Sequence, residues 1–286
     1  MAVGAVLVWL AVLVLAWLAT RRGERPIGAR AARWLIVGAG AVFPTLVLAA
    51  LLAYGLLRMP QLRADPSAAA LQVDVSGEQW WWRVRYRLPD GRTVELANEI
   101  HMPVGEPVAF TLTSPDVIHS FWIPALGGKL DMIPGRSNRF VLRADRAGVY
   151  RGICAEYCGS AHAFMGFQVV AQPRAQFDDW LRAQARPAAR VDDALAQRGE
   201  RLFLQHGCGG CHTVRGSAAN GPVGPDLTHV GSRLGIAAGM LGANAVQFER
   251  WINHAGALKP GVHMPSYAML PAAEVSALAA YLEALQ

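Results

Sequence analysis

Two long apolar runs near the start of the chain are separated by a short basic stretch. Residues 2–20 and 34–57 carry no charged side chain, and each run is about as long as a helix that crosses a bilayer. Pro44 lies inside the second run, where we expect a kink of the kind that membrane helices tolerate. The pattern predicts a transmembrane helical hairpin over residues 1–65, with helices at about 2–20 and 34–57.

The stretch between the runs sets the expected orientation. It holds five arginines and one glutamate, and basic loops of this kind stay in the cytoplasm. Both termini and everything after Arg58 are then expected on the outer side. A cleaved signal peptide is the alternative for residues 1–20, but no basic segment precedes this run and no clear small-x-small cleavage site follows it.

An alternation of apolar and polar side chains marks the middle of the chain as β-structure. Trp82, Val84, Tyr86 and Leu88 alternate with three arginines, as on a strand with two different faces. Further short runs, punctuated by Gly, Pro and Asp, follow at 93–96, 108–113, 140–143 and 167–170. Many short strands with regular turn signals predict a β-sandwich over residues 71–172.

Helical patterns dominate the last third of the chain. A short helix at 176–184 and an Ala/Pro/Arg-rich segment after it predict a linker over residues 173–191. Residues 192–286 predict an all-α domain, with helix caps at Asp192 or Asp193 and at Asn244 and a last helix at 272–285. The chain is thus expected to be a membrane protein with several domains.

The charge distribution narrows the class of partner. The net charge is +6, and residues 1–70 account for +5 of it. The basic character therefore belongs to the membrane hairpin, and it does not indicate nucleic-acid binding.

A short loop near the end of the predicted sandwich concentrates metal-binding side chains. Cys154, Cys158, His162 and Met165 follow one another at Cys-x3-Cys-x3-His-x2-Met spacing. Thiolate, imidazole and thioether ligands together select copper over hard cations. Two thiols on one loop suggest two metals that share them; a disulfide is the alternative in an exported domain, and a zinc site of this composition would rarely recruit methionine.

A second motif lies in the helical region. Cys208, Cys211 and His212 form a Cys-x2-Cys-His sequence, the attachment signature of a c-type haem. Zinc binding with other ligands, or a chance match, is the alternative. Two redox centres in one chain indicate electron transfer.

Residues 1–172 resemble subunit II of the cytochrome c oxidases of the haem–copper superfamily, with its cupredoxin-like copper domain. The resemblance rests on the loop and on three further blocks, at residues 77–82, 116–124 and 129–136. It implies a dinuclear copper centre, CuA, bridged by Cys154 and Cys158. It also implies that His119 and His162 each bind one copper, and that Met165 and the carbonyl of Glu156 are weak axial ligands.

The resemblance implies three further roles. The Glu156 side chain would bind a magnesium ion shared with subunit I, and Trp80 matches the tryptophan through which electrons enter the copper centre; a plain core aromatic is the alternative for Trp80. Asp65 lies near the place where the family has a carboxylate at a proton-channel mouth, although the local sequence differs and a solvated charge is the simpler interpretation.

Residues 192–286 resemble a class I cytochrome c. The resemblance implies that Gly199 and Phe203 cross the last helix near Tyr281, and that the Pro225 carbonyl accepts a hydrogen bond from His212. It makes Met264 the sixth haem ligand, with Met269 or His263 as alternatives. His206, His229 and His254 are expected at the surface.

Together, these features predict the subunit at which electrons enter a terminal cytochrome c oxidase, carrying its own cytochrome c domain. Electrons would pass from an external donor, such as a cytochrome bc complex or a cytochrome c, to haem c, to CuA and to haem a in subunit I. Oxygen reduction and proton pumping would occur in subunit I, with subunit III alongside, in a bacterial inner membrane. The alternatives are the CuA-bearing subunit of a nitric oxide reductase and a free-standing membrane-anchored redox carrier.

Overall fold

The chain divides into two units, residues 1–63 and residues 64–286. The computed structural model describes residues 2–21, 27–62, 69–88 and 90–286. Asp65, for which the sequence suggested a proton-channel role, lies outside these ranges.

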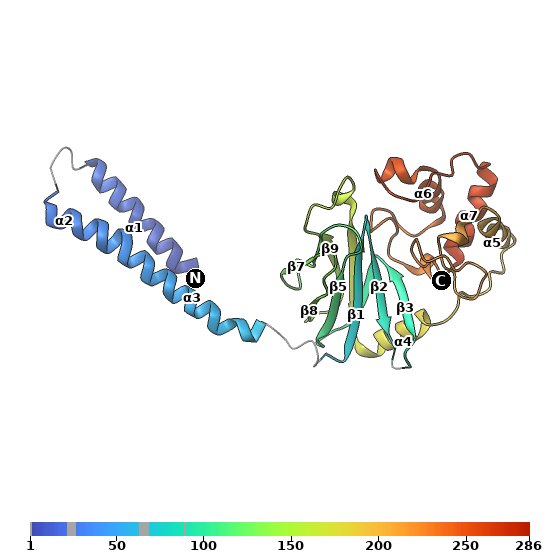
Figure 1. The fold of residues 1–286 in the computed structure, drawn as a ribbon, viewed down its shortest axis with the longest axis horizontal. Coiled ribbons are helices and arrows are strands. Elements are labelled where there is room, and N and C mark those ends of the chain that lie inside the picture. The colour runs from blue at the N-terminus through green and yellow to red at the C-terminus, as the bar shows by residue number, and fades with distance from the viewer. Residues whose placement is uncertain (1, 22–26, 63–68, 89) are drawn as a thin grey trace. The chain divides into compact units, whose positions relative to one another are not determined.

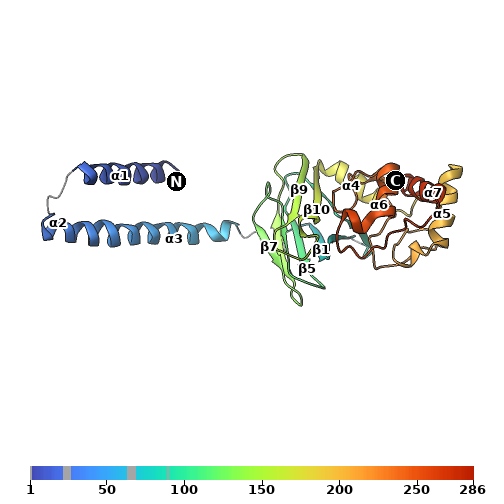
Figure 2. The same ribbon diagram turned by 90° about the horizontal axis from the view of Figure 1, so that it is seen from above.

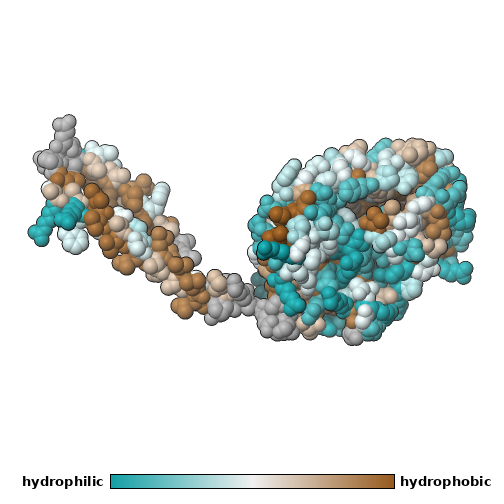
Figure 3. Space-filling model, viewed as in Figure 1, coloured by the Kyte–Doolittle hydropathy of each residue, from teal (hydrophilic) through white to brown (hydrophobic). Residues whose placement is uncertain are grey.

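The described part of the first unit is helical. Its elements are α1 (Ala2–Arg21), α2 (Ala29–Arg33), η1 (Trp34–Val42) and α3 (Phe43–Leu62). Val3–Arg21 and Ala29–Met59 are each long and apolar enough to cross a membrane. Their apolar side chains are exposed along both helices (Figure 3), and an apolar surface of this extent marks a site of interaction with a membrane or another protein. The second helix is longer at both ends than the predicted run of 34–57.

The expected disturbance around Pro44 takes a specific form. Segment η1 is a π-helical stretch that gives way to the regular helix α3 at Phe43. Proline has no backbone N–H, and its ring crowds the carbonyl four residues earlier. A wider turn immediately before Pro44 relieves this crowding.

In the second unit, the described strands form a β-sandwich of two five-stranded sheets, ordered β3-β2-β1-β5-β8 and β4-β10-β9-β6-β7. Figures 1 and 2 show the sandwich beside the C-terminal helices. The strands are β1 (Leu71–Glu78), β2 (Trp81–Arg87), β3 (Thr93–Ala97), β4 (Glu99–Pro103), β5 (Val108–Thr113), β6 (His119–Trp122), β7 (Lys129–Met132), β8 (Asn138–Leu142), β9 (Gly148–Cys154) and β10 (Gly166–Gln172).

The alternation in β2 builds the core between the sheets. Trp82, Val84 and Tyr86 are fully buried. The Trp82 ring lies 5.8 Å from the Phe121 ring and 5.0 Å from the Phe167 ring, both on the opposite sheet. These contacts join the two layers directly behind the metal-binding loop. Aromatic packing of this kind fixes the scaffold that carries the loop.

Helix α4 (Arg174–Gln184) follows β10 and packs against the sandwich. Phe177 of this helix is buried, and the ring of Trp180, also on α4, stacks on the His101 ring at 3.8 Å. The helix predicted for this segment is therefore confirmed, and it is part of the core of the sandwich. The domain boundaries read from the sequence remain a prediction.

The helical region contains α5 (Ala194–Gln205), η4 (Cys208–Gly210), η5 (Val230–Ser232), α6 (Ala245–Leu258) and α7 (Ala272–Ala284). Asp193 caps α5 by accepting a hydrogen bond from the Ala196 N–H at 2.9 Å. Asn244 caps α6 by accepting from the Gln247 N–H at 3.1 Å. Both predicted caps are confirmed, Asp193 being the one used at α5.

Helices α5 and α7 cross in close contact. A Cβ on Gly199 would lie 1.9 Å from the Ala277 carbonyl oxygen, so only glycine permits this approach. One turn further along α5, the Phe203 and Tyr281 rings meet edge to face at 5.6 Å. The crossing implied by the cytochrome resemblance is confirmed.

Candidate metal and haem sites

Strand pairing brings His119 next to the cysteine loop. His119 is the first residue of β6, and Cys154 is the last residue of β9. The two strands are antiparallel neighbours, with Phe121 opposite Cys154. The loop between β9 and β10 closes through a hydrogen bond from the Cys154 N–H to the Met165 carbonyl at 3.0 Å.

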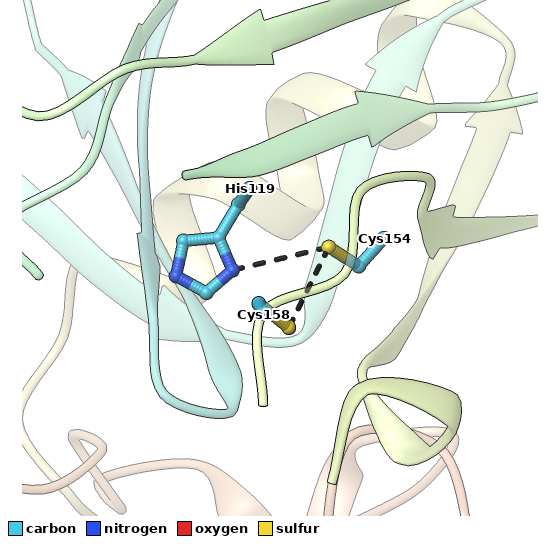
Figure 4. A group of neighbouring side chains, drawn as sticks. All are labelled: His119, Cys154 and Cys158. Carbon is cyan, nitrogen blue, oxygen red and sulfur yellow. Dashed lines mark hydrogen bonds between the residues drawn. The ribbon is translucent and has the colours of Figure 1, made fainter. Parts of the chain in front are cut away.

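The predicted copper ligands converge on one small volume. The two Sγ atoms lie 3.9 Å apart, and Figure 4 shows the Cys154 sulfur joined both to the His119 ring and to the Cys158 sulfur. Cys154 Sγ lies 3.8 Å from His119 Nδ1 and 3.2 Å from the Glu156 carbonyl oxygen. Cys158 Sγ lies 3.6 Å from His162 Nδ1 and 3.7 Å from Met165 Sδ. The arrangement is not a disulfide, whose sulfurs lie about 2.05 Å apart.

The two thiols shift each other's pKa in opposite directions. Their mutual hydrogen bond lowers the pKa of Cys154 to about 4. The same bond, together with burial, raises the pKa of Cys158 well above its ordinary value. A second thiolate so close to the first requires compensating positive charge, which metal ions supply by deprotonating a coordinating thiol. The donor set therefore fits two soft cations held between the sulfurs.

A hydrogen-bond network behind the copper loop orients His119. Its Nε2 lies 2.9 Å from Asp116 Oδ1, and the Gln79 N–H donates to the other oxygen of Asp116 at 2.7 Å. Burial opposes protonation of His119, but its hydrogen bonds with Cys154 and Asp116 outweigh this and raise its pKa. A carboxylate behind a ligating imidazole fixes the ring and directs the other nitrogen at the metal. Sequence reasoning missed Asp116 and Gln79 as supports of the site, although both lie inside the blocks that carry the resemblance.

The Glu156 side chain points away from the sulfur cluster. Its carboxylate is partly exposed and lies 3.5 Å from Lys129 Nζ, which also contacts Asp131 at 3.2 Å. The backbone of Glu156 thus faces Cys154, and its carboxylate faces a separate charged group.

The haem-attachment motif lines a cavity of about 260 Å³ in the helical region. The His212 Nδ1 is 2.8 Å from the Pro225 carbonyl oxygen, as the cytochrome resemblance implied. Burial lowers the pKa of His212, which keeps the imidazole neutral with Nδ1 protonated and Nε2 free to bind a metal. A Cβ on Gly224 would lie 2.6 Å from the His212 ring, so glycine is needed there.

The alternatives for the sixth haem ligand separate by position. Met264 and His263 both line the cavity with Cys208, Cys211 and His212. Met269 is 76% exposed and is not part of the lining. Met264 and His263 thus lie with the attachment motif, and Met269 does not.

The other histidines of this region differ in burial. His254 is exposed, as expected, and His206 pairs with Glu274 at 2.8 Å. His229 is 6% exposed and lies 3.0 Å from the Arg186 carbonyl through Nε2. The expectation of a surface position for His229 is therefore wrong, because the segment before α5 covers it.

Trp80 lies between the two predicted redox sites. Its indole Nε1 donates to the Cys158 carbonyl at 2.9 Å, while the same side chain lines the haem cavity. Lys259 lines this cavity too and donates to the Trp80 carbonyl at 2.6 Å. Sequence reasoning missed Lys259, although Lys129 and Lys259 are the only lysines among 27 basic residues.

Comparisons with known proteins agree with this arrangement. Residues 88–172 match the family model "Cytochrome C oxidase subunit II, periplasmic domain", and residues 196–286 match the family model "Cytochrome c". Cytochrome c oxidase subunit 2 of Alkalihalophilus pseudofirmus is 38% identical over 78% of this chain and 64% of the relative. The protein of the same name from Branchiostoma floridae is 32% identical over 49% of this chain and 68% of the relative.

A solved structure is also similar, namely the periplasmic domain of subunit II of cytochrome oxidase of Bradyrhizobium japonicum. It is 32% identical, with a TM-score of 0.39, and the match covers 42% of this chain and 96% of that one. The chain spans 62–64% of the length of the first three curated relatives. Because the chain is 32% identical to the Branchiostoma floridae subunit 2 and covers 68% of it, the chain belongs to the cytochrome c oxidase subunit II family, and its C-terminal region matches the cytochrome c model.

Proposed function

We propose that this chain is the subunit at which electrons enter a terminal cytochrome c oxidase. Electrons would pass from an external donor through a covalent haem c and a dinuclear copper centre to haem a in subunit I, where oxygen is reduced to water and protons are pumped. The observation that best supports the proposal is the position of Trp80. Its side chain donates a hydrogen bond to the carbonyl of Cys158 in the predicted copper site, and Trp80 also lines the predicted haem cavity.

The residues of the copper loop fit a dinuclear centre. Cys154 and Cys158 would bridge the two ions, His119 and His162 would each bind one, and Met165 and the Glu156 carbonyl would be weak axial ligands. Such a centre supplies one-electron transfer with little rearrangement of its ligands. The rigid supports described above, from Asp116 to the aromatic core, hold the ligands in place and so limit rearrangement further.

The residues of the haem cavity fit a c-type haem. Cys208 and Cys211 would form the thioether links, and His212 would be the proximal ligand, oriented by Pro225. Met264 would be the sixth ligand; a thioether in that position raises the reduction potential of the haem. A tethered haem domain also replaces a docking step by a high effective concentration.

The remaining partners follow from the same proposal. We expect subunit I, and subunit III beside it, to bind the membrane hairpin in a bacterial inner membrane, with the basic loop in the cytoplasm. The external donor would be a cytochrome bc complex or a cytochrome c. Magnesium shared with subunit I would bind at the Glu156 carboxylate, where Lys129 now lies 3.5 Å away.

Purification of the complex from membranes tests the proposal. Under anaerobic conditions, a reduced donor is expected to reduce the haem and then bleach the near-infrared copper band, and added oxygen should reoxidise both. A Cys154→Ser variant should accept electrons at the haem but pass them on to oxygen only very slowly. Oxygen consumption that survives in this variant would contradict the proposal.

Non-haem iron in the partner subunit would favour the nitric oxide reductase, and isolation without a haem-bearing partner would favour a free-standing carrier.

A further inference from the structure

The segment Lys259–Pro260–Gly261 of the cytochrome domain contacts the copper domain. Lys259 is 2% exposed, and its Nζ donates to the Trp80 carbonyl at 2.6 Å. The Pro260 carbonyl accepts a hydrogen bond from Ser160 Oγ at 3.1 Å. Three consecutive residues of one domain thus reach a strand connection and the metal-binding loop of the other.

The fit around Gly261 is close. A Cβ at this position would lie 2.5 Å from Ser160 Oγ and 2.7 Å from the Trp80 ring. The backbone of Gly261 also has a φ of +85°, which side chains other than glycine rarely adopt. The approach of this segment to the copper loop therefore depends on glycine.

The contacts of this segment connect the two predicted sites. Trp80, held by Lys259, donates to the carbonyl of Cys158, and Gln79 donates to the same carbonyl at 2.7 Å. On the other side, Lys259 is followed five residues later by Met264, the predicted axial haem ligand. One short segment therefore ties the wall of the haem cavity to a bridging cysteine.

The chemistry of Lys259 suits a buried contact. Burial lowers its pKa to about 7, so above this pH the amine lies neutral in the interface, where an uncompensated charge would be costly. A neutral amine still donates a hydrogen bond to the Trp80 carbonyl. Without this hydrogen bond the buried carbonyl oxygen would lose a donor, which would cost stability.

Other contacts between the two domains involve neither Trp80 nor Lys259. Arg83, which pairs with Glu78 and Glu95, also donates to the Pro222 carbonyl at 3.1 Å. The Leu234 N–H donates to Glu99 Oε2 at 2.8 Å. These contacts are distant in sequence from Lys259 and report independently on whether the domains are together.

We propose that Lys259–Gly261 hold the cytochrome domain docked on the copper domain, with Lys259 as the positioning residue that fixes Trp80 between the two redox sites. This rests on the proposed function, since it gives the haem domain a fixed place in the electron path. The segment at 185–190 then serves only as a connection between the domains, and the haem domain does not have to swing on it for each electron.

The test uses the full chain, loaded with copper and haem, at about pH 8.5. The Lys259→Met variant leaves the Trp80 carbonyl unpaired, so we expect the domains to separate more often and the Leu234 amide to exchange hydrogen about 5- to 100-fold faster. Electron transfer from the reduced haem to oxidised copper should slow, while the copper band and the haem spectrum stay unchanged. An Arg250→Met variant, which removes an exposed cation on α6, serves as the control.

Gly261→Ala provides a second variant that keeps Lys259 and is expected to give the same two effects. Gly105→Ala is its matched control, because Gly105 has a φ of +80° with nothing within 4 Å of an added Cβ. Unchanged Leu234 exchange and unchanged transfer in both variants would overturn the inference. A wild-type chain that shows no transfer from haem to copper would instead overturn the proposed function.

Discussion

The crossing of α5 and α7 gives a sharp test of the cytochrome fold through Gly199→Ala. The added Cβ would meet the Ala277 carbonyl oxygen at 1.9 Å and Tyr281 Cβ at 2.7 Å. A carbon–oxygen contact is normally about 3.3–3.6 Å, so the helices must separate by roughly 1.5 Å. Both partners are rigid parts of packed helices, and overpacking of this kind costs about 1–3 kcal/mol. We expect a loss at the upper end, about 3 kcal/mol, because the obstacle is backbone.

Denaturant unfolding followed by the haem absorbance measures this loss, and the copper band reports on the sandwich separately. The matched control is Gly256→Ala on α6, where nothing lies within 4 Å of the new Cβ. There alanine meets no obstacle and should raise the stability by at most about 0.5–1 kcal/mol, since glycine loses more conformational freedom on folding. The two substitutions should therefore shift stability in opposite directions. A Gly199→Ala variant as stable as the wild type would refute the helix crossing described here.

Further predictions concern the haem ligand and the buried lysine. Met264→Ala should keep the covalent haem and lower its reduction potential, because the thioether ligand is lost. Redox titration of the haem measures this change. Met269→Ala is the control and should leave the reduction potential unchanged, because Met269 is exposed. Lys259 has a pKa of about 7 in the folded chain and about 10.4 when unfolded. Between these values the unfolded chain binds a proton that the folded chain does not, so stability rises with pH by up to about 1.4 kcal/mol per pH unit. Urea unfolding at several pH values should show this slope in the wild type and not in Lys259→Met; equal slopes would contradict it.

The parts of the site that are local in sequence could be predicted from spacing alone. The loop from Cys154 to Met165 carries four donors within twelve residues, so their convergence needs only one turn of the chain. His119 is different, because its position depends on the pairing of β6 with β9. No pattern near His119 reveals that pairing, and only the resemblance pointed to it.

Most of the buried residues that the sequence did not reveal are covered by segments that are distant in the chain. Strand β4 is buried along its whole length, so it lacks the alternation that identified β2. Arg83 alternates like its neighbours, but it is buried because the cytochrome domain covers it. His229 and Lys259 are buried for similar reasons, through contacts with segments far away in the chain. Such contacts leave no periodic trace in the sequence.

The metal and haem content of the purified full chain, read together with its near-infrared spectrum, tests the central claim most directly. We predict two copper ions and one covalent haem per chain, with a band from the mixed-valence copper pair. In Cys158→Ser this band should vanish while the haem spectrum stays intact. A band that survives in the variant, or a wild-type chain that binds haem but no copper under copper-replete conditions, would contradict the account.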